Sequence, residues 1–108
     1  MTSYRPDRKE QLFVCIYRMN PSPPALPMSA EALHHQHRDW LQGLADKNLL
    51  VGSGPARDEA GRNHAGSVII LRADGFAAAK RLAGEEPNAR EGQRLAEVIP
   101  WHRMWFED

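Results

Sequence analysis

The stretch SAEALHHQHRDWLQGLADKNLLVGSGP, residues 29–55, carries the clearest folding signal in this chain. Ser29 is a plausible helix N-cap, because its hydroxyl can accept a hydrogen bond from a free N–H of the first turn. Apolar residues and one histidine then recur at helical spacing: Leu33, His37, Trp40, Leu41 and Leu44. The pattern predicts an amphipathic helix over residues 30–47, ended by Asn48, and a strand that starts at 49–51.

Three more extended segments are predicted around this unit. Residues 12–17 (LFVCIY) and 67–71 (SVIIL) are rich in β-branched and aromatic side chains, as strands are. The polar segment 57–63 predicts a hairpin loop before the second of these strands. The chain closes with an extended segment at 95–105, in which Pro100 favours an edge position or a bulge, since proline cannot donate to a neighbouring strand.

A second helix is predicted between the strand at 67–71 and the final segment. Asp74 can cap it, and Gly84 can end it. The resulting order is β-α-β-β-α-β, which predicts an α+β fold of the ferredoxin-like sandwich type. We expect residues 11–108 to form a single domain and residues 1–10, which are polar and contain a proline, to form a flexible tail.

The predicted strands are apolar on both faces. In residues 12–17, Phe13, Cys15 and Tyr17 lie on one face, and the other face is equally apolar. Two short helices can cover only one face of a four-stranded sheet, and a bare apolar face is unusual on a monomer. The sequence therefore predicts a homodimer that pairs sheet against sheet as a dimeric α+β barrel. The alternative is that these side chains are only half exposed.

Composition and charge exclude several classes of protein. The 108 residues contain 14 Lys plus Arg and 14 Asp plus Glu, and this balance argues against a nucleic-acid binder. No apolar stretch is long enough to span a membrane, and the polar N-terminus lacks the apolar segment of a secretory signal. Cys15 is the single cysteine, which excludes an intrachain disulfide and a cysteine-based zinc site. We expect a cytoplasmic protein.

His37 is the most informative polar residue, because it interrupts the apolar stripe of the first helix. Spacing alone favours a core histidine with a hydrogen-bond partner. The functional hypothesis is a general acid or base, since imidazole titrates near neutral pH. His34 lies three residues earlier, but two histidines do not make a metal site and no further ligand pattern is present, so we predict no metal. We interpret Arg81, Arg90 and Arg94 as surface charge.

Several of these features together resemble the YciI-like, or YCII-related, family over roughly residues 11–105. The resemblance rests on HRDWLQGLADKNLLVGSGP (37–55), in which a helix histidine precedes a Gly-Pro pair. It continues through SVIIL, an alanine-rich second helix, an acidic residue before Pro87 and a final strand that contains VIPW (98–101). Their order and spacing carry the resemblance, rather than any single motif.

The resemblance implies a ferredoxin-like dimeric α+β barrel with an active site made of the helix histidine and an aspartate before the proline of the turn. The histidine falls on His37, and the aspartate position falls on Glu86, whose carboxylate is one methylene further from the backbone. The Gly-Pro pair falls on Gly54 and Pro55. The best-understood chemistry of the family is elimination from a small chlorinated hydroxyquinol-type ring.

The leading hypothesis is a cofactor-independent lyase or isomerase that acts on a small cyclic or aromatic hydroxylated compound. His37 would transfer the proton and Glu86 would orient it. The predicted substrate-binding residues are Tyr17, His34, Trp40, Ser53, Gly54 and Pro55. Two alternatives stay open: a small-molecule-binding or regulatory dimer without turnover, and, by analogy of fold alone, a cofactor-free oxygenase.

Overall fold

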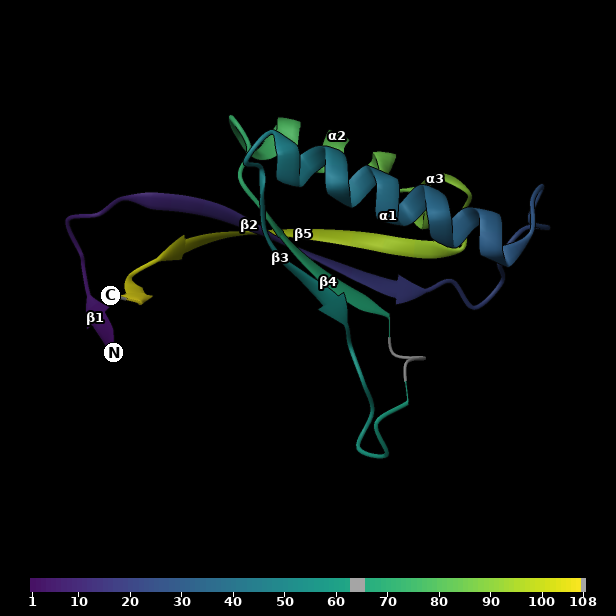
Figure 1. The fold of residues 1–108 in the computed structure, drawn as a ribbon, viewed down its shortest axis with the longest axis horizontal. Coiled ribbons are helices and arrows are strands. Elements are labelled where there is room, and N and C mark those ends of the chain that lie inside the picture. The colour runs from purple at the N-terminus through teal and green to yellow at the C-terminus, as the bar shows by residue number, and fades with distance from the viewer. Residues whose placement is uncertain (63–65, 108) are drawn as a thin grey trace.

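The computed structural model describes residues 1–62 and 66–107 (Figure 1). The predicted hairpin loop at 57–63 therefore ends outside the described residues. Over the described chain the elements are β1 (Thr2–Tyr4), β2 (Glu10–Met19), α1 (Ala30–Asp46), β3 (Leu50–Pro55), β4 (Ser67–Leu71), α2 (Phe76–Glu85), α3 (Pro87–Arg90), β5 (Arg94–Arg103) and β6 (Trp105–Glu107).

Four strands form the main sheet in the order β3-β4-β2-β5, and every neighbouring pair is antiparallel. The three helices lie together on one side of this sheet (Figure 1). This order is the one expected of a ferredoxin-like βαββαβ sandwich, in which each helical connection skips one strand position. The predicted α+β fold is confirmed. None of the helices in the described residues has the length and hydropathy needed to span a bilayer.

Helix α1 begins and ends almost where the sequence predicts. The Ser29 hydroxyl accepts a hydrogen bond from the backbone N–H of Ala32 at 3.0 Å. At the other end Asn48 has φ +58°, the left-handed conformation that asparagine tolerates better than most residues. The backbone N–H of Leu49 donates to the carbonyl of Leu44 across this turn. These local interactions fix where the chain leaves α1 and enters β3.

The core lies between the helices and one face of the sheet. Cys15 and Tyr17 on β2 and Ile69 and Leu71 on β4 are at most 1% exposed, and they pack against Leu44 and Ala83 of the helices. Val14 and Ile16 of β2 point to the opposite face, as the alternation of a strand requires. They are only half-buried. The helix-facing side is therefore the closed side of the sheet.

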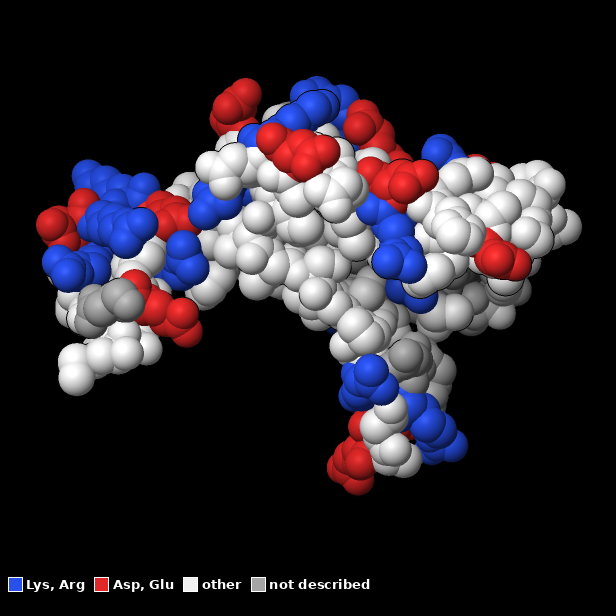
Figure 2. Space-filling model, viewed as in Figure 1, with Lys and Arg blue, Asp and Glu red and all other residues white. Residues whose placement is uncertain are grey.

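The opposite face of the sheet is apolar and carries no helix. By strand register, Val14 pairs with Ile70 and Ile99, and Ile16 pairs with Val68. Ile99 and Trp101 are each 41% exposed. In Figure 2 the surface between the N- and C-terminal ends of the chain and the β3–β4 hairpin is largely free of charged side chains. We call Val14, Ile16, Val68, Ile70, Ile99 and Trp101 the open face.

The second helix differs from the prediction at both ends. Its N-cap is Gly75, not Asp74, and no side chain caps it. Gly84 lies inside the helix, which ends one residue later at Glu85. Glu86 follows, and Pro87 then starts α3. Pro100 lies within β5, at the edge of the sheet, as predicted.

The N-terminal segment also differs from the predicted tail. Thr2–Tyr4 form strand β1, which pairs antiparallel with β6 at Trp105–Glu107. The long pairing of β2 with β5 runs from Met19 to Glu10 and so carries both chain ends away from the helices together (Figure 1). The Tyr4 and Trp105 rings lie 5.2 Å apart. Aromatic contact and strand pairing thus order a segment whose polar composition favours disorder.

Candidate active site

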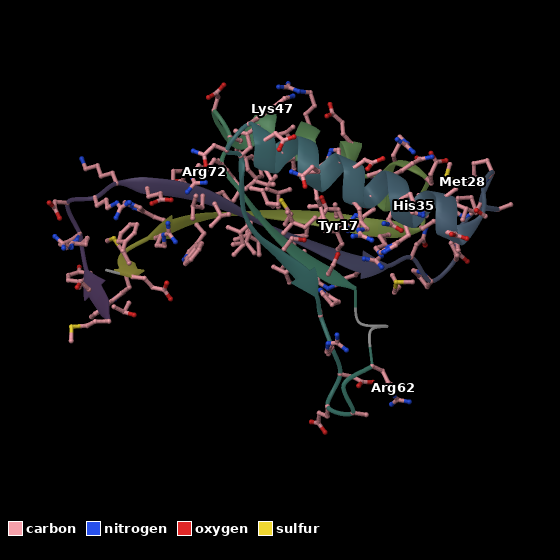
Figure 3. The ribbon with its side chains drawn as sticks, viewed as in Figure 1. Tyr17, Met28, His35, Lys47, Arg62 and Arg72 are labelled. Carbon is pink, nitrogen blue, oxygen red and sulfur yellow. The ribbon has the colours of Figure 1, made fainter. Side chains whose placement is uncertain are left out.

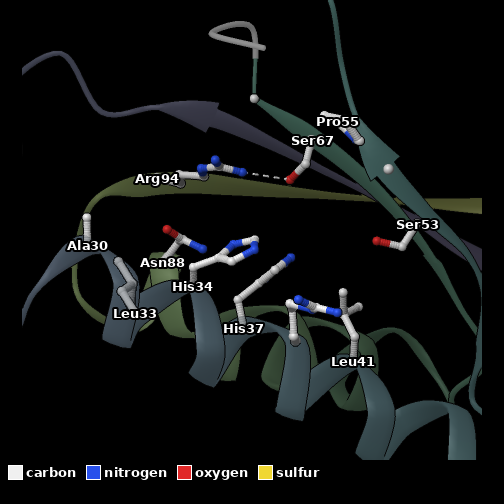
Figure 4. Close-up of a pocket in the computed structure, with 13 residues that line it drawn as sticks. Ala30, Leu33, His34, His37, Leu41, Ser53, Pro55, Ser67, Asn88 and Arg94 are labelled. Atoms are coloured by element: carbon white, nitrogen blue, oxygen red, sulfur yellow. Dashed lines mark hydrogen bonds between the residues drawn. The ribbon is translucent and has the colours of Figure 1, made fainter.

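A cleft of about 580 Å³ lies between α1 and the sheet (Figure 4). Its helix wall includes Leu33, His34, His37 and Leu41, and its sheet wall includes residues of β3, β4 and β5. Residues from five elements therefore meet at one cavity although they are far apart in the sequence. The described lining residues are Ala30, Leu33, His34, His37, Arg38, Leu41, Ser53, Gly54, Pro55, Gly66, Ser67, Asn88 and Arg94.

His37 and Glu86 form a short polar contact beside the cleft. The Nδ1 atom of His37 lies 2.7 Å from Oε1 of Glu86, across 49 residues of sequence. The His37 side chain is 17% exposed and the Glu86 side chain is 2% exposed. The extra methylene of glutamate therefore does not prevent the pair that the family resemblance implies. It delivers the carboxylate directly to the imidazole ring.

Glu86 is fixed by the short helix α3 as well as by His37. It is the N-cap of that helix: Oε1 accepts hydrogen bonds from the backbone N–H and the side-chain amide of Asn88, and Oε2 accepts one from the backbone N–H of Ala89. Burial by itself would raise the pKa of Glu86, but the hydrogen bonds from His37, Asn88 and Ala89 outweigh it and hold the pKa below its ordinary value. Glu86 is therefore a carboxylate at neutral pH.

The ionised carboxylate determines the tautomer of the neutral imidazole. A carboxylate can only accept hydrogen bonds, so Nδ1 of His37 must carry the proton that joins it to Glu86. Nε2 then holds a lone pair. Among the residues that the structure describes, none forms a hydrogen bond with Nε2. His37 lines the cleft, so the site presents one oriented proton acceptor to whatever occupies it.

Four of the predicted substrate-binding residues line the cleft with His37. His34 lies one turn before it on α1, with ring centroids 6.4 Å apart. Ser53, Gly54 and Pro55 come from the end of β3 on the opposite wall (Figure 4). The structure thus brings the helix histidines and the Gly-Pro segment together.

Tyr17 and Trp40, the other two predicted substrate-binding residues, are not among the described residues that line the cleft. Tyr17 is 1% exposed and lies between the sheet and the helices (Figure 3). Its hydroxyl donates to the Ala83 carbonyl at 2.9 Å. Burial, with smaller contributions from Cys15 and Glu86, raises the pKa of Tyr17 well above its ordinary value. Trp40 packs against the core cluster instead.

Sequence reasoning missed four polar residues of the cleft: Arg38, Ser67, Asn88 and Arg94. Arg94 had been interpreted as surface charge, yet it is half-buried and its Nη1 donates to the Ser67 hydroxyl at 3.0 Å. Ser67 is 9% exposed at the start of β4. Their positions in the strands could have indicated that they lie close together. Ser67 begins β4 and Arg94 begins β5, and because both strands flank β2 the two residues lie near the same end of the sheet.

Gly66 lines this end of the cleft, at a position where a residue with a side chain would clash with β2. It has φ +102°, and a Cβ atom built there would lie 1.8 Å from the Tyr17 carbonyl oxygen. Only glycine lets the chain pass this close to β2 and enter β4 at Ser67. The close approach positions the Ser67 hydroxyl on the cleft.

The fold and site define a ferredoxin-like α+β domain in which a histidine on the wall of a helix–sheet cleft is paired with a buried carboxylate. The family model of the YCII-related domain matches residues 11–102, and the chain belongs to this family. No curated protein matches the sequence.

A solved structure supports the fold. The chain is similar to 5-chloro-2-hydroxyhydroquinone dehydrochlorinase (TftG) from Burkholderia phenoliruptrix AC1100, solved in complex with 2,5-dihydroxybenzoquinone. The TM-score is 0.60 at 18% sequence identity, over 83% of this chain and 92% of the other. At this identity the similarity shows a shared fold.

Proposed function

We propose that this protein is a cofactor-independent lyase or isomerase that acts on a small cyclic or aromatic hydroxylated compound. The observation that carries the proposal is the 2.7 Å contact of His37 Nδ1 with the buried Glu86 carboxylate, which leaves Nε2 as a proton acceptor on the cleft. Membership in the YCII-related family and the fold shared with a dehydrochlorinase support elimination as the first reaction to test.

The proposed chemistry needs only proton transfer. Nε2 of His37 takes the proton of a ring hydroxyl, and the resulting imidazolium is stabilised by Glu86. For a chlorinated hydroxyquinol, a proton is delivered to the ring carbon that carries chlorine. A second hydroxyl then loses its proton as chloride leaves with the C–Cl electron pair, so the net products are a quinone and HCl. No oxidant is consumed, because the ring is oxidised at the expense of its C–Cl bond.

The test is an assay of the wild-type protein with 5-chloro-2-hydroxyhydroquinone under anaerobic conditions. We expect stoichiometric release of chloride and formation of a quinone, measured by a chloride electrode and by absorbance. Binding of the compound without chloride release would instead favour the non-catalytic module. Turnover that occurs only in air, with consumption of dioxygen, would favour the oxygenase.

The proposed assembly is a homodimer formed through the open face. This face spans three adjacent strands and carries aliphatic and aromatic side chains, two of which are 41% exposed. A second copy would cover this face by placing sheet against sheet and would remove apolar surface from water at roughly 25 cal/mol per Å². In an isologous pairing each copy supplies the same residues, so each open face would cover the other.

Analytical ultracentrifugation tests the dimer. We expect wild-type protein to sediment at twice the 12.2 kDa of the chain. Ile99→Arg should sediment at the mass of one chain, because an exposed position in the monomer accepts arginine but an apolar interface does not. Ala77→Arg, on the exposed side of α2, is the matched control and should stay dimeric. A wild-type protein that remains monomeric at micromolar concentration would contradict the proposal.

A further inference from the structure

The charged side chains that line the cleft all belong to basic residue types. They are Arg38 and Arg94; His34 and His37 add two imidazole rings, and no aspartate or glutamate occurs among the lining residues that the structure describes. The whole chain, by contrast, has equal numbers of acidic and basic residues. Glu86 lies behind His37 with its oxygens occupied by hydrogen bonds from α3 and from the imidazole. The two arginines therefore give the lining of the cleft a positive charge with no acidic residue beside them in the lining.

Arg94 is the half-buried one of these two arginines, whereas Arg38 is exposed. It lies on the sheet wall across from the histidines, and the Ser67 hydroxyl accepts a hydrogen bond from its Nη1 at 3.0 Å (Figure 4). Within the described residues no carboxylate pairs with Arg94 or Arg38. Elsewhere arginines do find such partners, as Arg18 does with Glu97 at 2.7 Å and Arg103 with Glu10 at 2.9 Å. A half-buried guanidinium without a counter-ion is costly unless a ligand supplies one.

The contact with Ser67 adds a second donor. Because the Ser67 oxygen accepts from Arg94, its own O–H is available to donate into the cleft. A guanidinium and a hydroxyl side by side present the donors that a carboxylate or a ring oxyanion accepts. His37 Nε2, on the facing wall, needs the opposite partner, an acidic proton.

We infer that the substrate carries an anionic group, a carboxylate or a ring oxyanion, that Arg94 and the Ser67 hydroxyl hold while a hydroxyl proton faces Nε2 of His37. The inference rests on the proposed function, since it names the class of compound that the same cleft would turn over. Arg38, on the exposed side of α1, adds to the positive potential at the mouth and attracts the anion without fixing its position.

A matched pair of probes tests the charge requirement. By isothermal titration, 2,5-dihydroxybenzoate should bind the wild-type protein about tenfold or more tightly than 2,5-dihydroxybenzamide, which has the same shape but no charge. Arg94→Gln should abolish this preference and leave the affinity for the amide unchanged. Arg81→Gln, an exposed arginine on α2, should keep it. The preference should also weaken as salt is raised from 50 to 500 mM.

The outcomes separate the two claims. Equal affinity of the wild type for the two probes, or a preference that survives in Arg94→Gln, would overturn the anion inference and leave the role of His37 untouched. Retention of the preference in a protein that never releases chloride would uphold the anion site and count against the proposed elimination.

Discussion

His37→Asn lowers kcat for the elimination by about a hundred- to ten-thousand-fold, the range that a positioned general base or acid contributes. The asparagine amide can still donate to Glu86 from near the place of Nδ1, so the buried carboxylate keeps a partner. It has no proton acceptor at the place of Nε2. The variant thus removes the chemistry with little change in the packing of the cleft. Steady-state chloride release is the measurement.

His35→Asn is the matched control for this prediction. His35 is the neighbouring histidine on α1, and its side chain is 67% exposed and outside the cleft. Its substitution should change kcat by less than twofold. Urea unfolding of both variants shows whether the fold is kept. If His37→Asn keeps more than a third of the wild-type kcat, His37 is not the group that moves the proton.

Glu86→Ala is expected to lower the free energy of unfolding at pH 7 by about 3 kcal/mol. The substitution removes the N-cap of α3, which costs up to about 2 kcal/mol. That cost covers the backbone N–H groups of Asn88 and Ala89, which lose their acceptor, and the substitution also takes the charged acceptor from His37 Nδ1, at roughly 1–3 kcal/mol. Glu85→Ala, at the exposed neighbouring position, should change the free energy by less than about 0.5 kcal/mol. Urea denaturation of both variants is the test, and equal stabilities would contradict the role given to Glu86.

The contribution of Glu86 should also depend on pH. Since its pKa is lower in the folded protein than the ordinary value of 4.5, its charge stabilises the fold above pH 4.5, and this stabilisation is lost as the pH falls through the folded pKa. The difference in stability between the wild type and Glu86→Gln should therefore be largest near neutral pH and shrink below pH 4.5. A difference that grows on acidification would reverse the assigned direction of the shift.

Glu86→Asp separates positioning from stability. Aspartate is a good N-cap and keeps the charge, but its carboxylate is one methylene shorter than the one that now reaches His37. If the backbone keeps its position, the kcat of Glu86→Asp should fall further than the change in its free energy of unfolding accounts for. The pH profile of kcat should also shift. Unchanged activity would mean that α3 can move to restore the contact.

Much of the fold follows from local patterns in the sequence. Ser29 and Asn48 bound α1 because capping and left-handed turns are decided by neighbouring residues. The alternation along β2 places Tyr17 on the same face as Cys15, and this face is the one that the helices cover. Periodicity does not exclude Tyr17 from the cleft, because its register partner Ser67 shares that face and lines the cleft; the burial of Tyr17 depends on the helices packed over it.

The features that were missed depend on contacts between distant segments. Ser67 and Arg94 are 27 residues apart and meet only because β4 and β5 both flank β2. Strand β1 is ordered by its pairing with β6, more than a hundred residues away, so its own polar sequence gives no sign of it. Local propensity cannot encode either contact. The approach of Glu86 to His37 was accessible only through resemblance to a family in which an acidic residue occupies that turn.

The most direct test of the proposed site is the nitrogen NMR spectrum of the His37 ring in ¹⁵N-labelled wild-type protein, recorded in the neutral imidazole form and assigned with His37→Asn. We expect Nδ1 to show the chemical shift of a protonated nitrogen and Nε2 that of an unprotonated one, because the Glu86 carboxylate accepts the single proton. A protonated Nε2 and a bare Nδ1 would mean that the pair does not present a base to the cleft.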